Sequence, residues 1–206
     1  MIKQQYWKEV YKALDPFTSD VFREAAWIVL DVETYDNNLH KITVDLGGAT
    51  KYGISKRAFP HLNIENLTLE ETFQIYHNYF QAAKAQYMER NLAIMHFNMG
   101  FNAGTGTAAK LLQEAINDTI PGKDMTLIVD GKIGPKTLKA LKYSTDTLNA
   151  NTILFQHYVI NMIKRYKTIA NVRRGKSYSK WAVELLSWLN RTYIVMDYIK
   201  IGNAIR

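Results

Sequence analysis

The chain has 206 residues, of which 47% are hydrophobic and 22% charged, a balance that allows a buried core and is ordinary for a soluble globular protein. The absence of cysteine excludes a disulfide framework, a thiolate metal site and a cysteine nucleophile. The net charge of +7 favours an anionic partner, which includes nucleic acid, a membrane surface and an acidic wall polymer, and does not choose among them.

The segment 1–10 is polar and lacks the apolar stretch of a secretory signal peptide. No apolar run reaches the roughly 20 residues that a membrane-spanning helix needs. We therefore expect a protein that is made in the cytoplasm without a signal peptide and does not insert into a membrane.

Helical patterns dominate the rest of the chain. Apolar residues at helical spacing predict a first helix over about 20–33, and Thr68 with Glu71 forms a capping box that predicts the start of another. The other predicted helices are 92–101, one capped by Thr107, one from Pro135 to about Lys142, and two long helices near 147–170 and 179–199.

The region 34–55 has no helical period. Its short β-branched piece, Ile42-Thr43-Val44, and the turn-forming Gly47-Gly48 predict a loop followed by a small β-hairpin. We predict a mostly α fold with a hairpin after the helix that ends at Glu33. Two lobes, 1–92 and 93–206, are expected to be integrated into one compact domain.

Glu33 is the first candidate for chemistry. A carboxylate in the last turn of a helix faces the negative end of the helix dipole, which disfavours its ionised form. Its neighbours Val29 and Leu30, one helical turn back, are apolar, so partial desolvation acts in the same direction. These are the conditions for a carboxylic acid that donates a proton, although a surface residue at a helix end fits the same spacing.

Asp45 lies in the polar, glycine-rich hairpin, where it would remain ionised. Two carboxylates in contrasting environments suit glycoside hydrolysis, because one protonates the leaving oxygen while the other acts as base, stabiliser or nucleophile. The hydroxyl of Thr50 can orient water or a carboxylate. Gly47 and Gly48 allow the backbone to approach a sugar closely.

The stretch from Glu33 through Asp45 to the run Gly47-Gly48-Ala49-Thr50-Lys51-Tyr52-Gly53-Ile54 resembles glycoside hydrolase family 108. These are N-acetylmuramidases of phages and bacteria that share a lysozyme-like helical fold. The resemblance implies hydrolysis of the β-1,4 bond between N-acetylmuramic acid and N-acetylglucosamine in peptidoglycan, with no cofactor. It places the catalytic acid on Glu33 and its partners on Asp45 and Thr50.

The second half resembles the peptidoglycan-binding-like part of the same family. The matching motifs are Asn98-x-Gly100, Ala108–Gln113, Val129–Leu138 and Trp188-Leu189-Asn190-Arg191. Within them, Asp130-Gly131 with Gly134-Pro135 and Thr137 also fits a structural turn before a helix, and we favour the turn over a glycan contact.

The sequence also departs from the family pattern. The family's Glu-Gly-Gly-Tyr motif is Glu33-Thr34-Tyr35-Asp36 here, and the stretch from Glu33 to Asp45 is longer than usual. The longer loop makes Asp36 a competitor of Asp45 for the second carboxylate. For substrate binding we predict Tyr35, Gly47, Gly48, Tyr52 and Asn98, and no metal site, because the five histidines lack metal-ligand spacing.

The sequence therefore predicts a monomeric peptidoglycan hydrolase, acting on glycan strands without a nucleic-acid partner. Its setting would be a phage endolysin that reaches the wall through a holin-type pore, an enzyme mounted on a virion, or a bacterial enzyme with non-standard export. One alternative is a non-catalytic wall-binding or virion-structural protein with the same fold. The other is a helical nucleic-acid-binding protein, which only the net charge supports.

Overall fold

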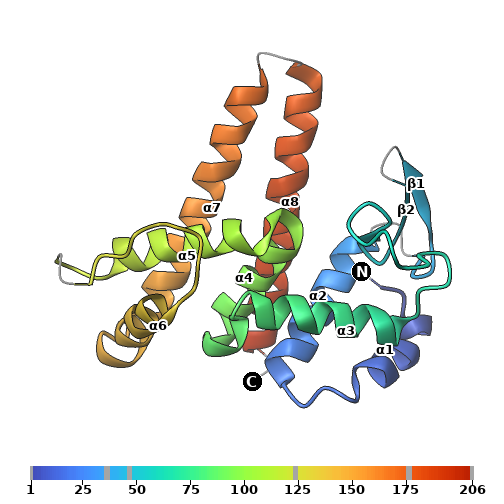
Figure 1. Cartoon of the computed structure of the whole chain (residues 1–206), viewed down its shortest axis with the longest axis horizontal. Helices are drawn as coiled ribbons and strands as arrows, with labels where there is room; N and C mark the ends of the chain where they lie inside the picture. Colours follow the sequence, from blue (N-terminus) through green and yellow to red (C-terminus); the bar gives the residue numbers. More distant parts are fainter. Residues whose placement is uncertain (1, 35–37, 46–47, 123–124, 175–177, 205–206) are drawn as a thin grey trace. The chain divides into compact units, whose positions relative to one another are not determined.

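The computed structural model describes residues 2–34, 38–45, 48–122, 125–174 and 178–204 (Figure 1). The chain divides into two compact units, Met1–Gln81 and Ala82–Arg206, which are described separately below. Helices form most of the described chain, and a small antiparallel sheet lies in the first unit. The predicted mostly α fold with a hairpin after the first long helix is therefore confirmed.

The helices of the first unit begin with a short 3₁₀ turn, Gln4–Tyr6, that leads into α1, Trp7–Leu14. Helix α2, Asp20–Glu33, has the predicted bounds, and the hydroxyl of Ser19 caps it by accepting a hydrogen bond from the Phe22 backbone N–H at 3.2 Å. Its inward face is fully buried and consists of Phe22, Ala25, Ala26, Ile28, Val29 and Leu30.

Helix α3, Leu69–Ala82, begins at the predicted capping box. The Glu71 backbone N–H donates to the Thr68 hydroxyl at 3.1 Å, and the Thr68 N–H donates to the Glu71 carboxylate at 2.9 Å. Because the box satisfies donors that the helix itself leaves unpaired, the start of α3 is fixed by its local sequence.

The sheet has three antiparallel strands in the order β1-β2-β3: Thr43–Asp45, Gly48–Lys51 and Ile54–Ser55. The register places Thr43 opposite Thr50 and Lys51 opposite Ile54. The predicted hairpin is therefore present, and a third strand extends it. The tight β2–β3 turn consists of Tyr52 and Gly53, with φ of 52° and 73°, the backbone conformation that two-residue hairpin turns favour.

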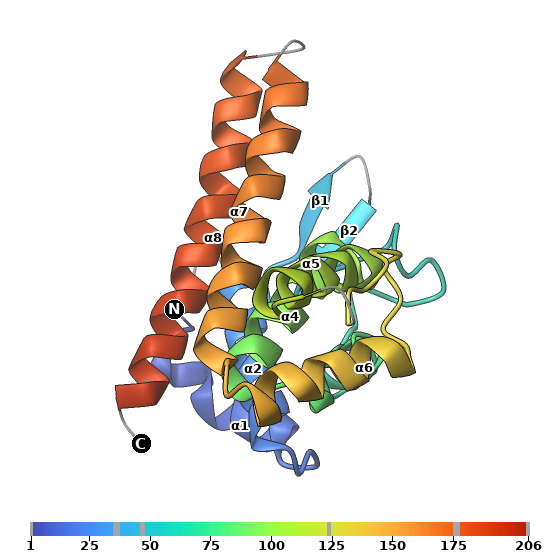
Figure 2. The ribbon, with the colours of Figure 1, turned by 90° about the vertical axis from the view of Figure 1, so that its left-hand side faces the viewer.

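Within the described residues of the second unit, every regular element is helical. Two of its helices, α7 and α8, are long and run side by side as a hairpin (Figure 2). Helix α5 packs against both α4 and α7. The elements are a 3₁₀ turn Ala85–Tyr87, α4 Arg90–Ala103, α5 Thr105–Thr119, α6 Pro135–Lys142, a π-helical turn Tyr143–Thr147, α7 Asn151–Arg174 and α8 Tyr178–Ala204.

The predicted cap of α5 is wrong. The helix starts at Thr105 instead of after Thr107, with Gly104 as N-cap and no side-chain cap, and the Thr107 N–H donates to the Gly104 carbonyl. Gly104 has φ +88°, a conformation that ends α4 and turns the chain into α5 within one residue. This turn leaves no connecting segment for a hydroxyl cap.

A buried polar pair joins α4 to α7. His96 is completely buried, its Nε2 lies 3.0 Å from the Ala83 carbonyl oxygen, and its Nδ1 lies 3.1 Å from the Tyr158 hydroxyl. Desolvation lowers the pKa of His96 to about 4, so the ring is neutral near pH 7. Nε2 then donates to the carbonyl while Nδ1 accepts from Tyr158, which makes His96 part of the core.

The Asp130-Gly131 turn is locked by one glutamine side chain. The Gln113 amide donates to the Asp130 carboxylate at 2.8 Å, and its carbonyl oxygen accepts from the Gly131 N–H at 2.9 Å. The Lys132 N–H also donates to Asp130, and these donors, Gln113 first, hold the pKa of Asp130 below its usual value. The structure thus contains the turn that we favoured for this motif.

Within the described residues, no helix combines the length and the apolar character that crossing a membrane requires.

Candidate active site

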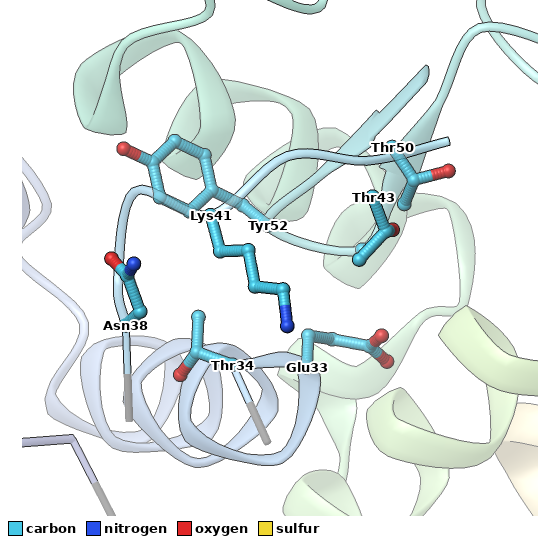
Figure 3. A pocket seen from close by; sticks show the side chains of 8 residues that line it. Glu33, Thr34, Asn38, Lys41, Thr43, Thr50 and Tyr52 are labelled. Atoms are coloured by element: carbon cyan, nitrogen blue, oxygen red, sulfur yellow. The ribbon is translucent and has the colours of Figure 1, made fainter. Parts of the chain in front are cut away.

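A pocket of about 290 Å³ opens in the first unit where the C-terminal end of α2 meets the sheet (Figure 3). Three of the predicted site residues, Glu33, Thr50 and Tyr52, line it together. The complete lining is Glu33, Thr34, Asn38, Lys41, Thr43, Thr50, Tyr52 and Gly53. The structure therefore brings the predicted acid and the predicted threonine to one concave surface.

Glu33 is the last residue of α2, and Thr34 ends the helix behind it. The backbone N–H and the hydroxyl of Thr34 both donate to the Leu30 carbonyl, at 3.0 and 2.9 Å. Thr34 is only 7% exposed. These two hydrogen bonds stabilise the final turn of α2 and therefore the backbone position from which the Glu33 side chain extends.

Gly53 provides the space in which the Glu33 side chain lies. A Cβ atom on Gly53 would lie 2.7 Å from Cγ, 2.8 Å from Cδ and 2.9 Å from Oε2 of Glu33. The φ of +73° at this position is also one that favours glycine. A side chain at position 53 would therefore require the Glu33 side chain to shift, a role of this glycine that was not predicted from the sequence.

Hydrogen bonds of Tyr52 hold the same turn in place. Its ring is 3% exposed, its hydroxyl lies 2.8 Å from Nδ1 of His40, and its carbonyl accepts from the Tyr76 hydroxyl at 2.7 Å. Nε2 of His40 in turn lies 3.2 Å from the carboxylate of Glu9. Burial, with the nearby charges of Glu9 and Glu70, raises the pKa of Tyr52, so its hydroxyl stays protonated.

Two threonine hydroxyls complete the sheet side of the pocket. Thr43 of β1 and Thr50 of β2 are direct cross-strand partners. Figure 3 shows their side chains together at the sheet, on the side of the pocket toward which the Glu33 carboxylate extends. Hydroxyls can both donate and accept, so this pair is suited to orienting a water molecule or a sugar hydroxyl near the carboxylate.

The remaining predicted residues lie elsewhere or outside the described part. Asp45 ends β1 with its backbone opposite Gly48, and its side chain is outside the described part, as are Tyr35, Asp36 and Gly47 entirely. Gly48 has φ +90° and does not line the pocket.

Asn98 belongs to α4 of the second unit and is 5% exposed. Its side-chain oxygen accepts from Nε of Arg191 on α8 at 3.0 Å, so two of the motifs that resemble the family meet in the structure. Its substrate-binding role stays a prediction.

Lys41, Asn38 and Thr43 line the pocket although sequence reasoning did not single them out. In the sequence, only their position between Glu33 and the glycine-rich run could have indicated that they belong to the site. Among the described residues, no group of three or more histidine, aspartate or glutamate side chains could hold a metal ion.

Comparisons with known proteins agree with this geometry. The family model described as Glycosyl hydrolase 108 matches residues 29–104, and the model described as Predicted Peptidoglycan domain matches residues 107–192. The first match contains every residue of the pocket lining. The comparison with curated proteins gives no match.

Among solved structures, that of Brucella abortus SagA is similar, with a TM-score of 0.59 and 18% sequence identity over 85% of this chain and 94% of that chain. This likeness concerns the fold, and it confirms the predicted lysozyme-like helical architecture. The two family models lead to one assignment: residues 29–104 are a glycosyl hydrolase 108 region followed by a peptidoglycan-domain region over 107–192, and the chain is a peptidoglycan hydrolase.

Proposed function

We propose that the protein is an N-acetylmuramidase, which hydrolyses the β-1,4 bond between N-acetylmuramic acid and N-acetylglucosamine with Glu33 as the general acid. The observation that carries this proposal is the Glu33 carboxylate in a polar pocket, with its place defined by Gly53. A glycosidic oxygen is a poor leaving group until it is protonated, and a carboxyl group extending from a helix end into such a pocket can supply the proton.

The other groups have subordinate roles in this mechanism. The Thr50 hydroxyl positions the water molecule or the second carboxylate, and Asp45 activates that water or stabilises the positive charge that develops on the sugar ring. Tyr52 holds the turn that contains Gly53, and it also lines the pocket. The mechanism needs no cofactor.

The expected reaction product distinguishes this proposal from other activities. Purified peptidoglycan digested by the protein and then reduced with borohydride should yield N-acetylmuramitol ends, detected by mass spectrometry. N-acetylglucosaminitol ends would indicate a glucosaminidase instead, and anhydro ends would indicate a reaction without water. Wall binding without any product would favour the non-catalytic wall-binding or virion-structural protein, which the departure from the family motif after Glu33 suggests.

The second carboxylate can be identified by comparing two variants. We expect Asp45→Asn to lower the cleavage rate at least about tenfold and more than Asp36→Asn, because Asp45 keeps the family's offset to Thr50 and is held in the β1–β2 register. Initial rates on purified walls, with circular dichroism to verify folding, provide the measurement. A larger loss in Asp36→Asn would mean that the longer loop has moved this role to Asp36.

The proposed setting is lysis of a bacterial cell by a phage, with the protein made in the host cytoplasm and acting on glycan strands as a monomer without nucleic acid. The resemblance of the motifs to family 108 is the support for this setting.

A further inference from the structure

A lysine side chain extends into the same pocket as the Glu33 carboxylate. Figure 3 shows Lys41 reaching across the pocket with its ammonium group beside Glu33. Apart from these two residues, the lining consists of neutral hydroxyl, amide, phenol and backbone groups. The pocket therefore combines one acid with one cation, and proton donation to a glycosidic oxygen uses only the acid.

The backbone that carries Lys41 is fixed from several directions. The Lys41 N–H donates to the Asn38 carbonyl at 3.1 Å, which closes a turn over residues 38–41. Within this turn, Leu39 is 1% exposed, and His40 is hydrogen-bonded to both Tyr52 and Glu9. The side chain of Lys41 therefore starts from a constrained turn at the edge of the pocket.

Two other lysines near the sheet have a different use. The ammonium group of Lys51 donates to the backbone carbonyls of Leu67 and Glu65, at 2.8 and 3.3 Å, and that of Lys56 donates to the Leu62 carbonyl at 2.7 Å. These contacts hold loops in place. Lys41 lines the pocket, which neither Lys51 nor Lys56 does.

We propose that Lys41 is a specificity-determining residue, whose ammonium group binds a carboxylate carried by the N-acetylmuramic acid unit of the substrate. This inference rests on the function proposed above. N-acetylglucosamine is uncharged, whereas the lactyl ether of N-acetylmuramic acid ends in a carboxylate or, where a stem peptide is attached, leads to the carboxylates of that peptide. A cation in the pocket therefore favours the acidic sugar over the neutral one.

Three substrates separate the sources of the carboxylate. Peptide-free glycan strands present the lactyl carboxylate, the same strands after methyl esterification present no carboxylate, and peptide-bearing strands present only the carboxylates of the peptide. Lys41→Met should raise KM about tenfold on the strands whose carboxylate it binds, and leave KM on the esterified strands unchanged. The charged substrate that shows the loss identifies the source.

Two further variants serve as controls. Lys41→Arg should restore most of the affinity because it keeps the positive charge. Lys12→Met, on the exposed face of α1, removes a lysine of the same unit outside the pocket and should leave KM unchanged on all three substrates. An equal loss in Lys41→Met on charged and esterified strands would overturn the proposal, because Lys41 would then act on Glu33 or on the fold. Unchanged KM on both charged substrates would overturn it as well.

Equilibrium binding in a Glu33→Gln background separates this inference from the proposed function, because binding needs no turnover. Glu33→Gln and Glu33→Gln/Lys41→Met are titrated with the same three kinds of strand. Weaker binding of a charged strand in the double variant supports the role of Lys41 even if the wild-type protein releases no N-acetylmuramitol ends, a result that contradicts only the muramidase. Equal binding by both variants, beside normal wild-type cleavage, overturns only the role of Lys41.

Discussion

Replacing Glu33 by glutamine is expected to lower the rate of peptidoglycan cleavage by about 10²–10⁴-fold, the usual contribution of a general acid. Glutamine has nearly the same shape as glutamate, so the pocket and the contact with Gly53 are preserved. Its amide N–H groups are far too weakly acidic to protonate the glycosidic oxygen. Release of reducing ends from purified walls gives the rate, and thermal melting by circular dichroism verifies the fold.

Glu65→Gln is a matched control for this experiment. Glu65 belongs to the same unit, its side chain is exposed, and it does not line the pocket. The substitution removes the same charge and should leave the cleavage rate unchanged. If Glu33→Gln kept more than about a tenth of the wild-type rate, Glu33 would not be the general acid.

Replacing Gly53 by alanine is expected to lower the cleavage rate by about a hundredfold without unfolding the protein, because a displacement of about 1 Å in a reacting group can have an effect of this size. The new Cβ would lie within 3 Å of three atoms of the Glu33 side chain, so the carboxylate must move. The loss of rate should appear in kcat. Separately, alanine in the positive-φ conformation of position 53 is expected to lower the free energy of unfolding by about 1–2 kcal/mol.

Gly122→Ala distinguishes displacement of the acid from backbone strain. Gly122 has φ +91°, and nothing lies within 4 Å of a Cβ built there. Alanine at this exposed position should lower the melting temperature to a similar extent and leave kcat unchanged. Similar kcat values for Gly53→Ala and Gly122→Ala would show that contact with Gly53 does not govern the position of Glu33.

Much of the helical framework could be predicted because its signals are local. The bounds of α2, the capping box of α3 and the Pro135 start of α6 follow from hydrophobic period, hydroxyl caps and proline geometry, and all three are confirmed. Helix α1 was not predicted, since it is short and follows a 3₁₀ turn in a polar segment. The division of the chain at residue 92 stays a prediction.

The site was predictable only in part. Glu33 and Thr50 were found because their residue types and the glycine-rich run resemble a family pattern, and the structure brings both to one pocket. Lys41 and Gly53 were not found, because their importance comes from contacts made across the fold. The closeness of Gly53 to Glu33, for example, depends on how the sheet packs against the end of α2.

The contact between Gly53 and Glu33 has a consequence for how this protein can change by mutation. Every single-base change in a glycine codon that replaces the residue by another introduces a Cβ, and at position 53 that atom meets the Glu33 side chain. Under the mechanism proposed above, we therefore expect that one codon change at position 53 weakens catalysis while the fold persists, so a protein that only binds the wall is a single mutational step away.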